Sequence, residues 1–583
     1  MNRLVSIVLL LAGSTIVRAD EDAKLATFFK TYLEDFLKNA PLDASRLGDH
    51  RYDDRLDDLS AKARAANVQR QRDALEALSK AVAAEKLSME GKVDCQILKD
   101  SLTRTVWLAE NTNPFAEDPR VWNEYITDSV YLILTQSTAE KSKGVRDAAS
   151  RITYIPATVR SAKESLKNPT LVMLDTAVRM NRGAIAFYEK GIFEITGETP
   201  TVSVLAEPCK SAVVALKDYQ KFLEEQQPKA TGEWRIGKKK FAEKLQTELD
   251  AGPGLEADEV LKLAIAEADR VRNEMYVIAR QLWFKLIVGK PLPPDDADGR
   301  RECIRRVMGE LGKEHGEVST MVADAKRTSD EIKAFIKAKD ILRLPDPDRC
   351  QIIEMPEFQR GNSTAFLNPA PPLDPKASSH YAVSPPPRDW DDRRVKSYLE
   401  EYNAAMMKIL SIHEAYPGHY VQLEYSNRHP SLIRKVLSSG TFAEGWAVYT
   451  EQMMLDQGFG NGDLSLRLHQ LKFYLRAVIN TILDHRMHCE QMTDTEALKL
   501  LVEGGFQTEG EALGKIVRAK QSSCQLSTYF VGRMAFYRLR TQVSRELGDK
   551  FDLGRYHEAV LDHGTVPVKF LPELVRERLK KAR

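Results

Sequence analysis

Two histidines and a glutamate lie close together in residues 411–420, which read SIHEAYPGHY. Glu414 directly follows His413, and His419 comes six positions after His413. In the zinc-binding pattern H-E-x-x-H the histidines are four apart, so both imidazoles reach one ion from the same helix face, and the glutamate can polarise the metal-bound water. An interval of six separates them by about 120° on an ideal helix. The segment therefore needs an interrupted helix to bind a metal.

The pair Pro417-Gly418 lies between the two histidines and can supply that interruption. Proline cannot donate the next helical hydrogen bond, and its ring clashes with the preceding turn. Glycine can adopt backbone angles that are closed to other residues. We therefore expect the pair to loop out the two additional residues and return His419 to the metal. The alternative is that His413 is a hydrogen-bonded core histidine, the pair ends a helix, and His419 has no role.

A third metal ligand is expected because hydrolytic zinc sites have three protein ligands and one open position. Residues 441–452, TFAEGWAVYTEQ, predict a helix that is apolar on both sides and therefore buried. A buried carboxylate needs a cation or hydrogen-bond donors, which makes Glu444 the candidate ligand. Glu451 lies near the same face and is a candidate to orient a ligand histidine. The alternative for Glu444 is a carboxylate favoured by a helix N-terminus.

Helices are expected to position these residues. Apolar residues at steps of three and four predict helices over most of residues 20–344, and a stripe that begins at Val395 leads to His413 and points it inward. In residues 345–390 prolines are frequent, and the short stretches 351–355 and 381–383 predict edge strands. A plain linker is the alternative for this segment. We expect a mainly α protein with a small β element, and a helical metal-binding region over residues 391–583.

The first 19 residues have the order of a signal peptide. An early Arg3 is followed by an apolar run and by Val17-Arg18-Ala19, which predicts cleavage after Ala19. The run is too short to span a bilayer comfortably, and no cysteine follows it that would accept a lipid. The alternative is a buried N-terminal helix. We expect an exported protein, periplasmic or secreted, without a stable membrane anchor.

The composition excludes several classes of function. The chain has 85 basic and 84 acidic residues, a balance that gives no electrostatic footprint for nucleic acid. Its six cysteines form no C-x-x-C pair, so they indicate neither a disulfide scaffold nor a cysteine metal site. The sequence also has no G-x-S-x-G elbow and no phosphate-binding glycine loop.

The segments HEAYPGHYVQ and FAEGWAVYTE resemble the bacterial DUF885 family, a group similar to gluzincin metallopeptidases. The resemblance covers nearly the whole chain after residue 19. It implies a helical fold with a central cleft, Glu414 as general base, and Glu444 as the ligand that joins His413 and His419. Supporting segments are Arg46-Leu47-Gly48-Asp49-His50, Arg235-Ile236-Gly237, residues 483–488, residues 527–529 with Gly532, and residues 563–567.

Similar gluzincins stabilise the oxyanion with a histidine and a tyrosine, and the resemblance assigns these roles to His488 and Tyr529. Asp484 precedes His488 by four residues and is a candidate to fix its tautomer. Arg533 is a candidate to receive a substrate carboxylate through its planar guanidinium. The alternatives are a surface helix pair for Asp484 and His488, and an ordinary salt bridge for Arg533.

These observations predict an exported zinc peptidase with one ion per chain that cleaves peptides, short ones by the resemblance. A second hypothesis is an exported binding or scaffold protein with a degenerate or structural metal site, closed by a fourth side chain such as Glu451 or His488. A third is metal-dependent hydrolysis of a non-peptide amide or ester. The identity of the ion, the preferred peptide and the oligomeric state stay open.

Overall fold

A computed structural model describes residues 2–199, 201–252, 254–355, 365–388 and 390–581, with side chains from residue 20 onward. The chain divides into two compact units. Unit 1 comprises residues 1–234, 370–377 and 427–437, and unit 2 comprises residues 235–369, 378–426 and 438–583. These units do not follow the expected boundaries at residues 344 and 390. The reason is that helices lie on both sides of residue 234, so no change of pattern marks it.

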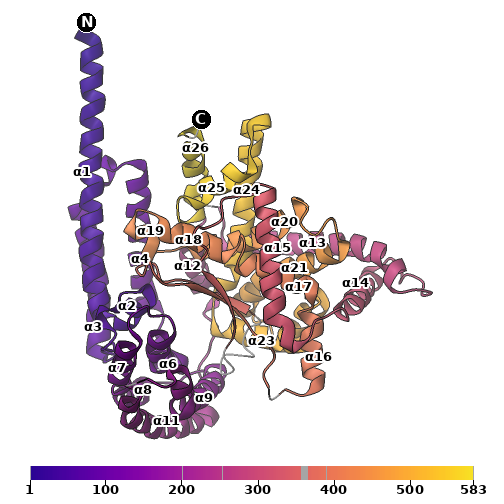
Figure 1. Cartoon of the computed structure of the whole chain (residues 1–583), viewed down its shortest axis with the longest axis horizontal. Helices are drawn as coiled ribbons and strands as arrows, with labels where there is room; N and C mark the ends of the chain where they lie inside the picture. The colour runs from indigo at the N-terminus through magenta and orange to yellow at the C-terminus, as the bar shows by residue number, and fades with distance from the viewer. Residues whose placement is uncertain (1, 200, 253, 356–364, 389, 582–583) are drawn as a thin grey trace. The chain divides into compact units, whose positions relative to one another are not determined.

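The regular secondary structure of unit 1 is helical in its described residues. Helices α6, α7, α8, α9 and α11 pack together (Figure 1) around a core that includes Trp122, Val130 and Leu216. The α-helices of unit 1 are α1 (Asn2–Asn39), α2 (Pro41–Leu47), α3 (Ala61–Ala81), α4 (Met89–Asn111), α5 (Pro114–Glu117), α6 (Pro119–Thr135), α7 (Lys141–Ile152), α8 (Ile155–Ser165), α9 (Leu171–Ala186), α10 (Ile192–Thr196), α11 (Ala206–Gln226) and α19 (Leu432–Val436).

Unit 2 contains the remaining α-helices, and in it α17 packs against both α20 and α21 (Figure 1). Together with the sheet described below, this confirms the predicted mainly helical fold. The α-helices are α12 (Gly237–Leu249), α13 (Ala257–Leu286), α14 (Ala297–Gly312), α15 (Met321–Ala338), α16 (Asp392–Glu401), α17 (Ala404–Glu414), α18 (His419–Arg428), α20 (Gly440–Asp456), α21 (Leu464–Cys489), α22 (Asp494–Lys499), α23 (Glu509–Gln521), α24 (Thr528–Leu547), α25 (Leu553–Leu561) and α26 (Leu571–Lys581).

The apolar stripe that leads to His413 is divided between two helices rather than carried by one. Helix α16 ends at Glu401, and α17 starts after Asn403. The Asn403 side chain accepts hydrogen bonds from the backbone N–H groups of Ala405 and Met406, both at 3.1 Å. Such a cap satisfies donors that a helix start leaves unpaired, so it favours a new helix at this point.

The described strands form one sheet in unit 2 with the order β1-β3-β2. Strands β1 (Cys350–Glu354) and β3 (Ser379–Val383) are parallel and confirm the two predicted strands. The predicted edge position is wrong for β3, which lies in the centre because β2 pairs with its other side. The sequence pattern does not predict β2 (Ala365–Asn368), which pairs antiparallel with β3. The connection from β2 to β3 contains residues 370–377, which belong to unit 1.

Helices α20 and α24 cross at two glycines in unit 2. A Cβ atom on Gly532 would lie 2.0 Å from the carbonyl oxygen of Thr441 and 2.6 Å from the Cα of Gly445. A Cβ on Gly445 would lie 2.4 Å from the Cα of Gly532. Only glycine allows this approach, since real Cβ contacts are never so short. The crossing brings the start of α24 next to the first turns of α20.

Residues 2–39 form the single helix α1. The side chains of residues 1–19 lie outside the described part of the chain, and cleavage of the predicted signal peptide stays a prediction. No helix among the described residues combines the length and apolar character needed to cross a membrane.

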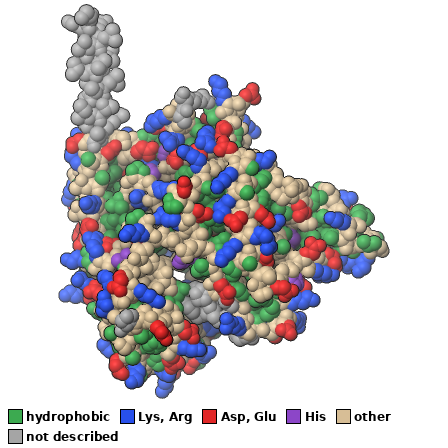
Figure 2. All heavy atoms as spheres, viewed as in Figure 1, with side chains coloured by type: hydrophobic (Ala, Val, Ile, Leu, Met, Phe, Trp, Pro, Cys, Tyr) green, Lys and Arg blue, Asp and Glu red, His purple; other side chains and the backbone are tan. Residues whose placement is uncertain are grey.

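Acidic and basic side chains are intermixed over the face drawn in Figure 2. This agrees with the near-equal numbers of the two kinds in the sequence. The expectation that nucleic acid is not a partner stays a prediction.

Gly532→Ala is expected to lower the free energy of unfolding by about 1–3 kcal/mol, because the added methyl group overpacks the crossing of α20 and α24. The midpoint of thermal unfolding measures this effect. Gly309→Ala on α14 is the matched control, since a Cβ there meets no atom within 4 Å. It should be neutral or stabilise by up to about 1 kcal/mol. Equal effects of the two substitutions would contradict the role of the crossing.

Candidate metal centre

The chain between the two histidines folds back onto the end of α17. His413 lies in the last turn of α17, and His419 is the first residue of α18. The backbone N–H of Gly418 donates to the carbonyl of Ile412 at 3.0 Å, and that of Tyr416 donates to Ser411 at 3.1 Å. The predicted interruption at the Pro-Gly pair is therefore present, and it turns His419 back toward His413.

Gly418 is required for a different reason from the predicted one. Its φ angle is not among the positive values, so no left-handed conformation is involved. A Cβ atom there would instead lie 1.9 Å from the carbonyl oxygen of His413 and 2.3 Å from that of Ile412. The turn can close on α17 only because residue 418 has no side chain. The indole N–H of Trp446 on α20 donates to the carbonyl of Pro417 at 2.8 Å and holds the turn in place.

Both histidines face the Glu444 carboxylate. The Nε2 atoms of His413 and His419 lie 3.9 and 3.4 Å from Glu444 Oε2, and the three ligand atoms are within 4.8 Å of one another. The separation of 3.4 Å allows only a weak hydrogen bond, and that of 3.9 Å allows none. Both separations are close to the roughly 3.3–3.6 Å between two ligands of a tetrahedral zinc ion with bonds of about 2.0–2.2 Å. The donor set of two imidazoles and one carboxylate therefore fits a zinc ion.

The electrostatics of the cluster suit a bound cation. Burial and the neighbouring His419 lower the pKa of His413 to about 3, which keeps its imidazole neutral, as a metal ligand must be. Burial alone would raise the pKa of Glu444, but hydrogen bonding and charge from His419 hold it below its usual value. The carboxylate therefore stays ionised beside the two imidazoles.

Glu451 orients His413 from behind. One carboxylate oxygen lies 2.7 Å from His413 Nδ1, and the Glu451 side chain is 0% exposed. This contact fixes the ring so that its other nitrogen points toward Glu444. A carboxylate in this position is typical of metal-binding histidines. The structure thus places Glu451 beside His413, where the sequence predicts a residue that orients a ligand histidine.

Glu414 lies beside the cluster and touches the sheet. Its Oε2 accepts a hydrogen bond from the backbone N–H of Leu367 in β2 at 3.0 Å. Burial, with a contribution from the charge of Glu444, raises the pKa of Glu414 to about 7, although the charge of His419 opposes this. A carboxyl group with such a pKa can exchange a proton near neutral pH.

Tyr529 joins the cluster from the first turn of α24. Its hydroxyl is among the groups that lower the pKa of Glu444, and it accepts a hydrogen bond from the Arg518 guanidinium at 3.3 Å. The glycine crossing of α20 and α24 explains this position, since Gly532 lies three residues after Tyr529 and Gly445 directly follows Glu444.

His488 and Asp484 are not brought to the cluster. The His488 Nε2 lies 3.0 and 2.8 Å from the carbonyl oxygens of Ala519 and Ser522, to which its N–H donates. Asp484 is 3.8 Å from that nitrogen, too far to fix the tautomer, and instead accepts from the backbone N–H of Cys524 at 3.2 Å. Both residues are buried, so they are not a surface pair either. They hold the connection between α23 and α24.

Arg533 contacts other protein groups. Its guanidinium donates to the Tyr474 hydroxyl at 2.8 Å and to the Gln452 side chain at 2.5 Å, and it lies 3.6 Å from the centre of the Tyr474 ring. These contacts tie α24 to α21 and α20. The side chain is therefore engaged within the fold, in contrast to the predicted role of receiving a substrate carboxylate.

Three aromatic residues of the two motifs support the site, although the sequence reasoning gave them no role. Trp446 holds the turn, Tyr416 donates to Asp348 at 2.8 Å, and the Tyr420 hydroxyl accepts the backbone N–H of Arg349 at 2.7 Å. The two tyrosines fix the segment that leads into β1. The sequence could have indicated these supporting roles, because each of the three residues has an aromatic ring with a polar group and lies within three residues of a predicted ligand.

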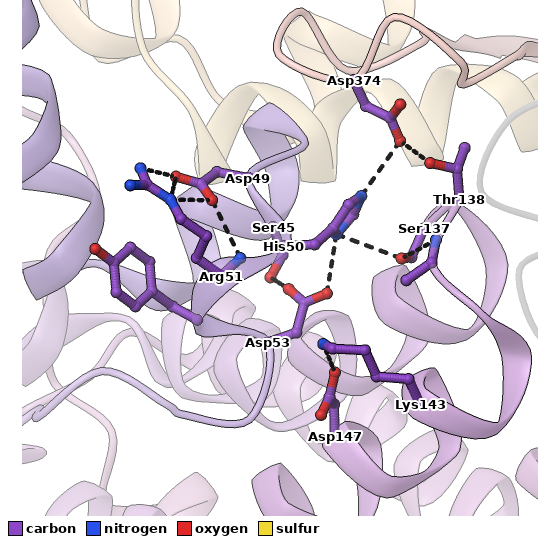
Figure 3. Close-up of polar contacts among 12 residues, drawn as sticks. Ser45, Asp49, His50, Arg51, Asp53, Ser137, Thr138, Lys143, Asp147 and Asp374 are labelled. Atoms are coloured by element: carbon purple, nitrogen blue, oxygen red, sulfur yellow. Dashed lines mark hydrogen bonds and ion pairs between the residues drawn. The ribbon is translucent and has the colours of Figure 1, made fainter.

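The segment Arg46-Leu47-Gly48-Asp49-His50 lies in unit 1 and contacts another segment of that unit, residues 370–377. Figure 3 shows His50 between two carboxylates, with Nδ1 2.9 Å from Asp53 and Nε2 3.3 Å from Asp374. A Cβ on Gly48 would lie 2.8 Å from the backbone nitrogen of Asp374. These contacts dock residues 370–377, the connection between β2 and β3.

Comparison with protein families gives a match over residues 41–575 to DUF885, described as a bacterial protein of unknown function. The chain belongs to the DUF885 family. Among solved structures it is similar to a putative lipoprotein of unknown function from Shewanella oneidensis, with 28% identity, a TM-score of 0.80, and coverage of 95% of this chain and 99% of that one. A putative lipoprotein from Colwellia psychrerythraea shares the fold, with 18% identity, a TM-score of 0.79, and coverage of 96% and 99%. No curated protein matches the chain.

Metal binding by this DUF885 protein is expected to need all three cluster side chains. After dialysis against zinc, elemental analysis should find one ion per chain in the unchanged protein and almost none in His419→Ala or Glu444→Ala. His315→Ala is the control, because its ring contacts only the neighbouring backbone among the described residues. Full zinc content in either cluster variant would refute the site.

Glu451→Gln is expected to weaken zinc binding by about 10- to 100-fold, because an amide replaces the carboxyl group that orients His413. Competition with a chelator of known affinity measures the change. Asp456→Asn on the same helix is the control, since that carboxylate pairs with Arg467 away from the cluster. An unchanged zinc affinity in Glu451→Gln would show that the contact between Glu451 and His413 does not strengthen zinc binding.

Proposed function

We propose that the protein is an exported, zinc-dependent metallopeptidase that hydrolyses short peptides. The cluster of His413, His419 and Glu444 would hold one ion per chain. A zinc ion in this place would supply a Lewis acid that polarises a peptide carbonyl and lowers the pKa of a water molecule. The protein's own groups would position the substrate and transfer the protons.

The observation that carries this proposal is that the cluster is buried on one side and accessible on the other. We call the buried side the back and the accessible side the open front. His413 and Glu451 are buried, whereas the side chains of His419 and Glu444 are 14% and 21% exposed. Glu414 and Tyr529 are also partly exposed. Among the described residues, this group has three ligands and no fourth. A catalytic zinc site needs such an accessible side, and a structural site is closed by four side chains.

Glu414 is proposed as the general base. It lies next to His413 in the chain, and its pKa of about 7 suits a group that accepts a proton from water and passes it to the leaving amine. The hydrogen bond from the Leu367 N–H holds one of its oxygens and leaves the other for the water.

Tyr529 is proposed to stabilise the oxyanion that forms when the peptide carbonyl is attacked. Burial and the charge of Glu444 raise its pKa to about 12, so the phenol keeps its proton at neutral pH. A neutral hydroxyl can donate to developing negative charge. His488, which the resemblance pairs with Tyr529, has no part in the proposed mechanism because its N–H is held by backbone carbonyls.

Export is part of the proposal. The order of residues 1–19 predicts a cleaved signal peptide. The two similar solved structures come from proteins described as putative lipoproteins, a class that is exported.

A binding or scaffold protein with a structural metal site is the alternative from another class. It would require Glu451 or His488 as a fourth ligand. Glu451 instead contacts the rear nitrogen of His413, and His488 is held by α23 and its following residues. The geometry therefore supports the hydrolase better.

Glu414→Gln is expected to lower peptide hydrolysis by about 10²- to 10⁴-fold while zinc stays bound, because the amide cannot accept a proton. Mass spectrometry of a pool of short peptides, incubated with zinc-loaded protein, measures the cleavage. Glu546→Gln on α24 is the control, since that glutamate forms a surface ion pair with Arg576 and should leave cleavage unchanged.

Three results of this experiment would each contradict a different part of the proposal. No cleavage by the unchanged, zinc-loaded protein would overturn the peptidase assignment. Full activity of Glu414→Gln would overturn the role of Glu414. Hydrolysis of small ester or non-peptide amide substrates, with none of peptides, would assign the site to that chemistry instead.

A further inference from the structure

A buried lysine on α23 lies near the cluster without a direct ion pair. Lys515 is only 6% exposed. Among the residues that the structure describes, none forms a hydrogen bond or an ion pair with its ammonium group. Because a buried charge without a partner is costly, such a group in a folded protein calls for a ligand.

The surroundings of Lys515 are rich in positive charge. Arg476 on α21 and Arg518 on α23 are both close enough for their charges to act on it, and Glu511 is the nearby carboxylate on the same helix. Glu511 is already ion-paired with Arg476. Two carboxylates act on Lys515, namely Glu511, which is paired with Arg476, and Glu444, which belongs to the metal centre. Neither forms a direct ion pair with Lys515, so a carboxylate from a ligand could take that place.

This cationic group adjoins the metal centre. The charge of Glu444 acts on Lys515, and burial together with the two arginines nevertheless lowers the pKa of Lys515 well below its usual value. Arg518 is exposed and donates to the Tyr529 hydroxyl at 3.3 Å, which links the group to the proposed oxyanion donor. All of these residues belong to unit 2.

We propose that Lys515, assisted by Arg476 and Arg518, binds a carboxylate of the substrate beside the bond that is cleaved. This inference rests on the proposed peptidase function and gives it a substrate class, peptides that carry a carboxylate at this position. The carboxylate has two sources, the free C-terminus of the peptide or the side chain of an acidic residue. An ammonium group and two guanidinium groups suit either source through charge-assisted hydrogen bonds.

Paired peptides separate the two sources. One pair has the same sequence with a C-terminal acid or a C-terminal amide, and the other pair has glutamate or glutamine at one position. We expect the zinc-loaded protein to favour the acid member of one pair by roughly 10- to 100-fold in kcat/KM, the range for a hydrogen bond to a charged group. The pair that shows the preference identifies the source.

Lys515→Met tests the residue, since methionine has a similar length and no charge. The acid-to-neutral ratio should fall close to one. The variant should also unfold at a higher temperature without substrate, because a buried charge without a partner has been removed. A lysine with a purely structural role would give the opposite shift in stability and leave the ratio unchanged.

Lys472→Met is the matched control, because Lys472 is similarly buried but paired with Glu401 at 2.7 Å. It should unfold at a lower temperature and keep the acid preference. Arg518→Gln is a second, exposed test variant that should reduce the preference in part, whether or not Lys515→Met folds.

The failures of the two proposals can be told apart. Equal cleavage of acid and neutral peptides, or a preference retained in both Lys515→Met and Arg518→Gln, would overturn the carboxylate site and leave the peptidase intact. If no peptide is cleaved, the peptidase proposal has failed, and calorimetric binding of the same pairs still decides the carboxylate site. Equal binding of both members would then overturn it.

Discussion

The metal centre depends on the close contact between the Pro417-Gly418 turn and the end of α17. The turn reverses the chain within a few residues, and its backbone N–H groups donate to carbonyls that the helix end leaves free. The absence of a side chain at Gly418 allows this contact, and the indole of Trp446 holds it from α20. Without this reversal, two histidines six positions apart would point to different sides of a helix.

The residues around the cluster are of two kinds, those proposed to take part in the chemistry and those that hold them in position. Side chains that face the open front are partly exposed, and those behind them are buried and hydrogen-bonded to one another. Each supporting contact joins the cluster to a different element, such as Glu451 from α20, Tyr381 from β3 through Ser411 at 3.2 Å, and Tyr420 to the start of β1. Since buried polar groups need partners, these contacts also explain why the helices that surround the site carry so many polar residues.

Much of the site could be predicted because its signals are local. His413, Glu414 and His419 lie within seven residues, and the predicted buried helix of residues 441–452 placed Glu444 and Glu451 on nearly one face. The strands β1 and β3 were visible as short apolar stretches between prolines. Strand β2, with four residues, gives too little pattern to be recognised.

The rest could not be predicted because it depends on which distant segments meet. The sequence shows that His488 and Asp484 follow a helical stripe, but not that their partners are the backbone of residues 519–524. Gly445 and Gly532 belong to segments that resemble the family, but their contact appears only when α20 and α24 cross. For the same reason Lys515 had no signal, since a lysine on an amphipathic helix is ordinarily exposed.

The β2–β3 connection has a consequence for how this protein can be divided. The chain passes between the two units after residues 234, 369, 377, 426 and 437, so neither unit is one continuous stretch. A fragment that ends at residue 234 lacks two pieces of unit 1, and the complementary fragment carries those pieces without their partners. Neither unit can therefore be exchanged or produced as a simple module, which agrees with a family match that spans the chain as one block.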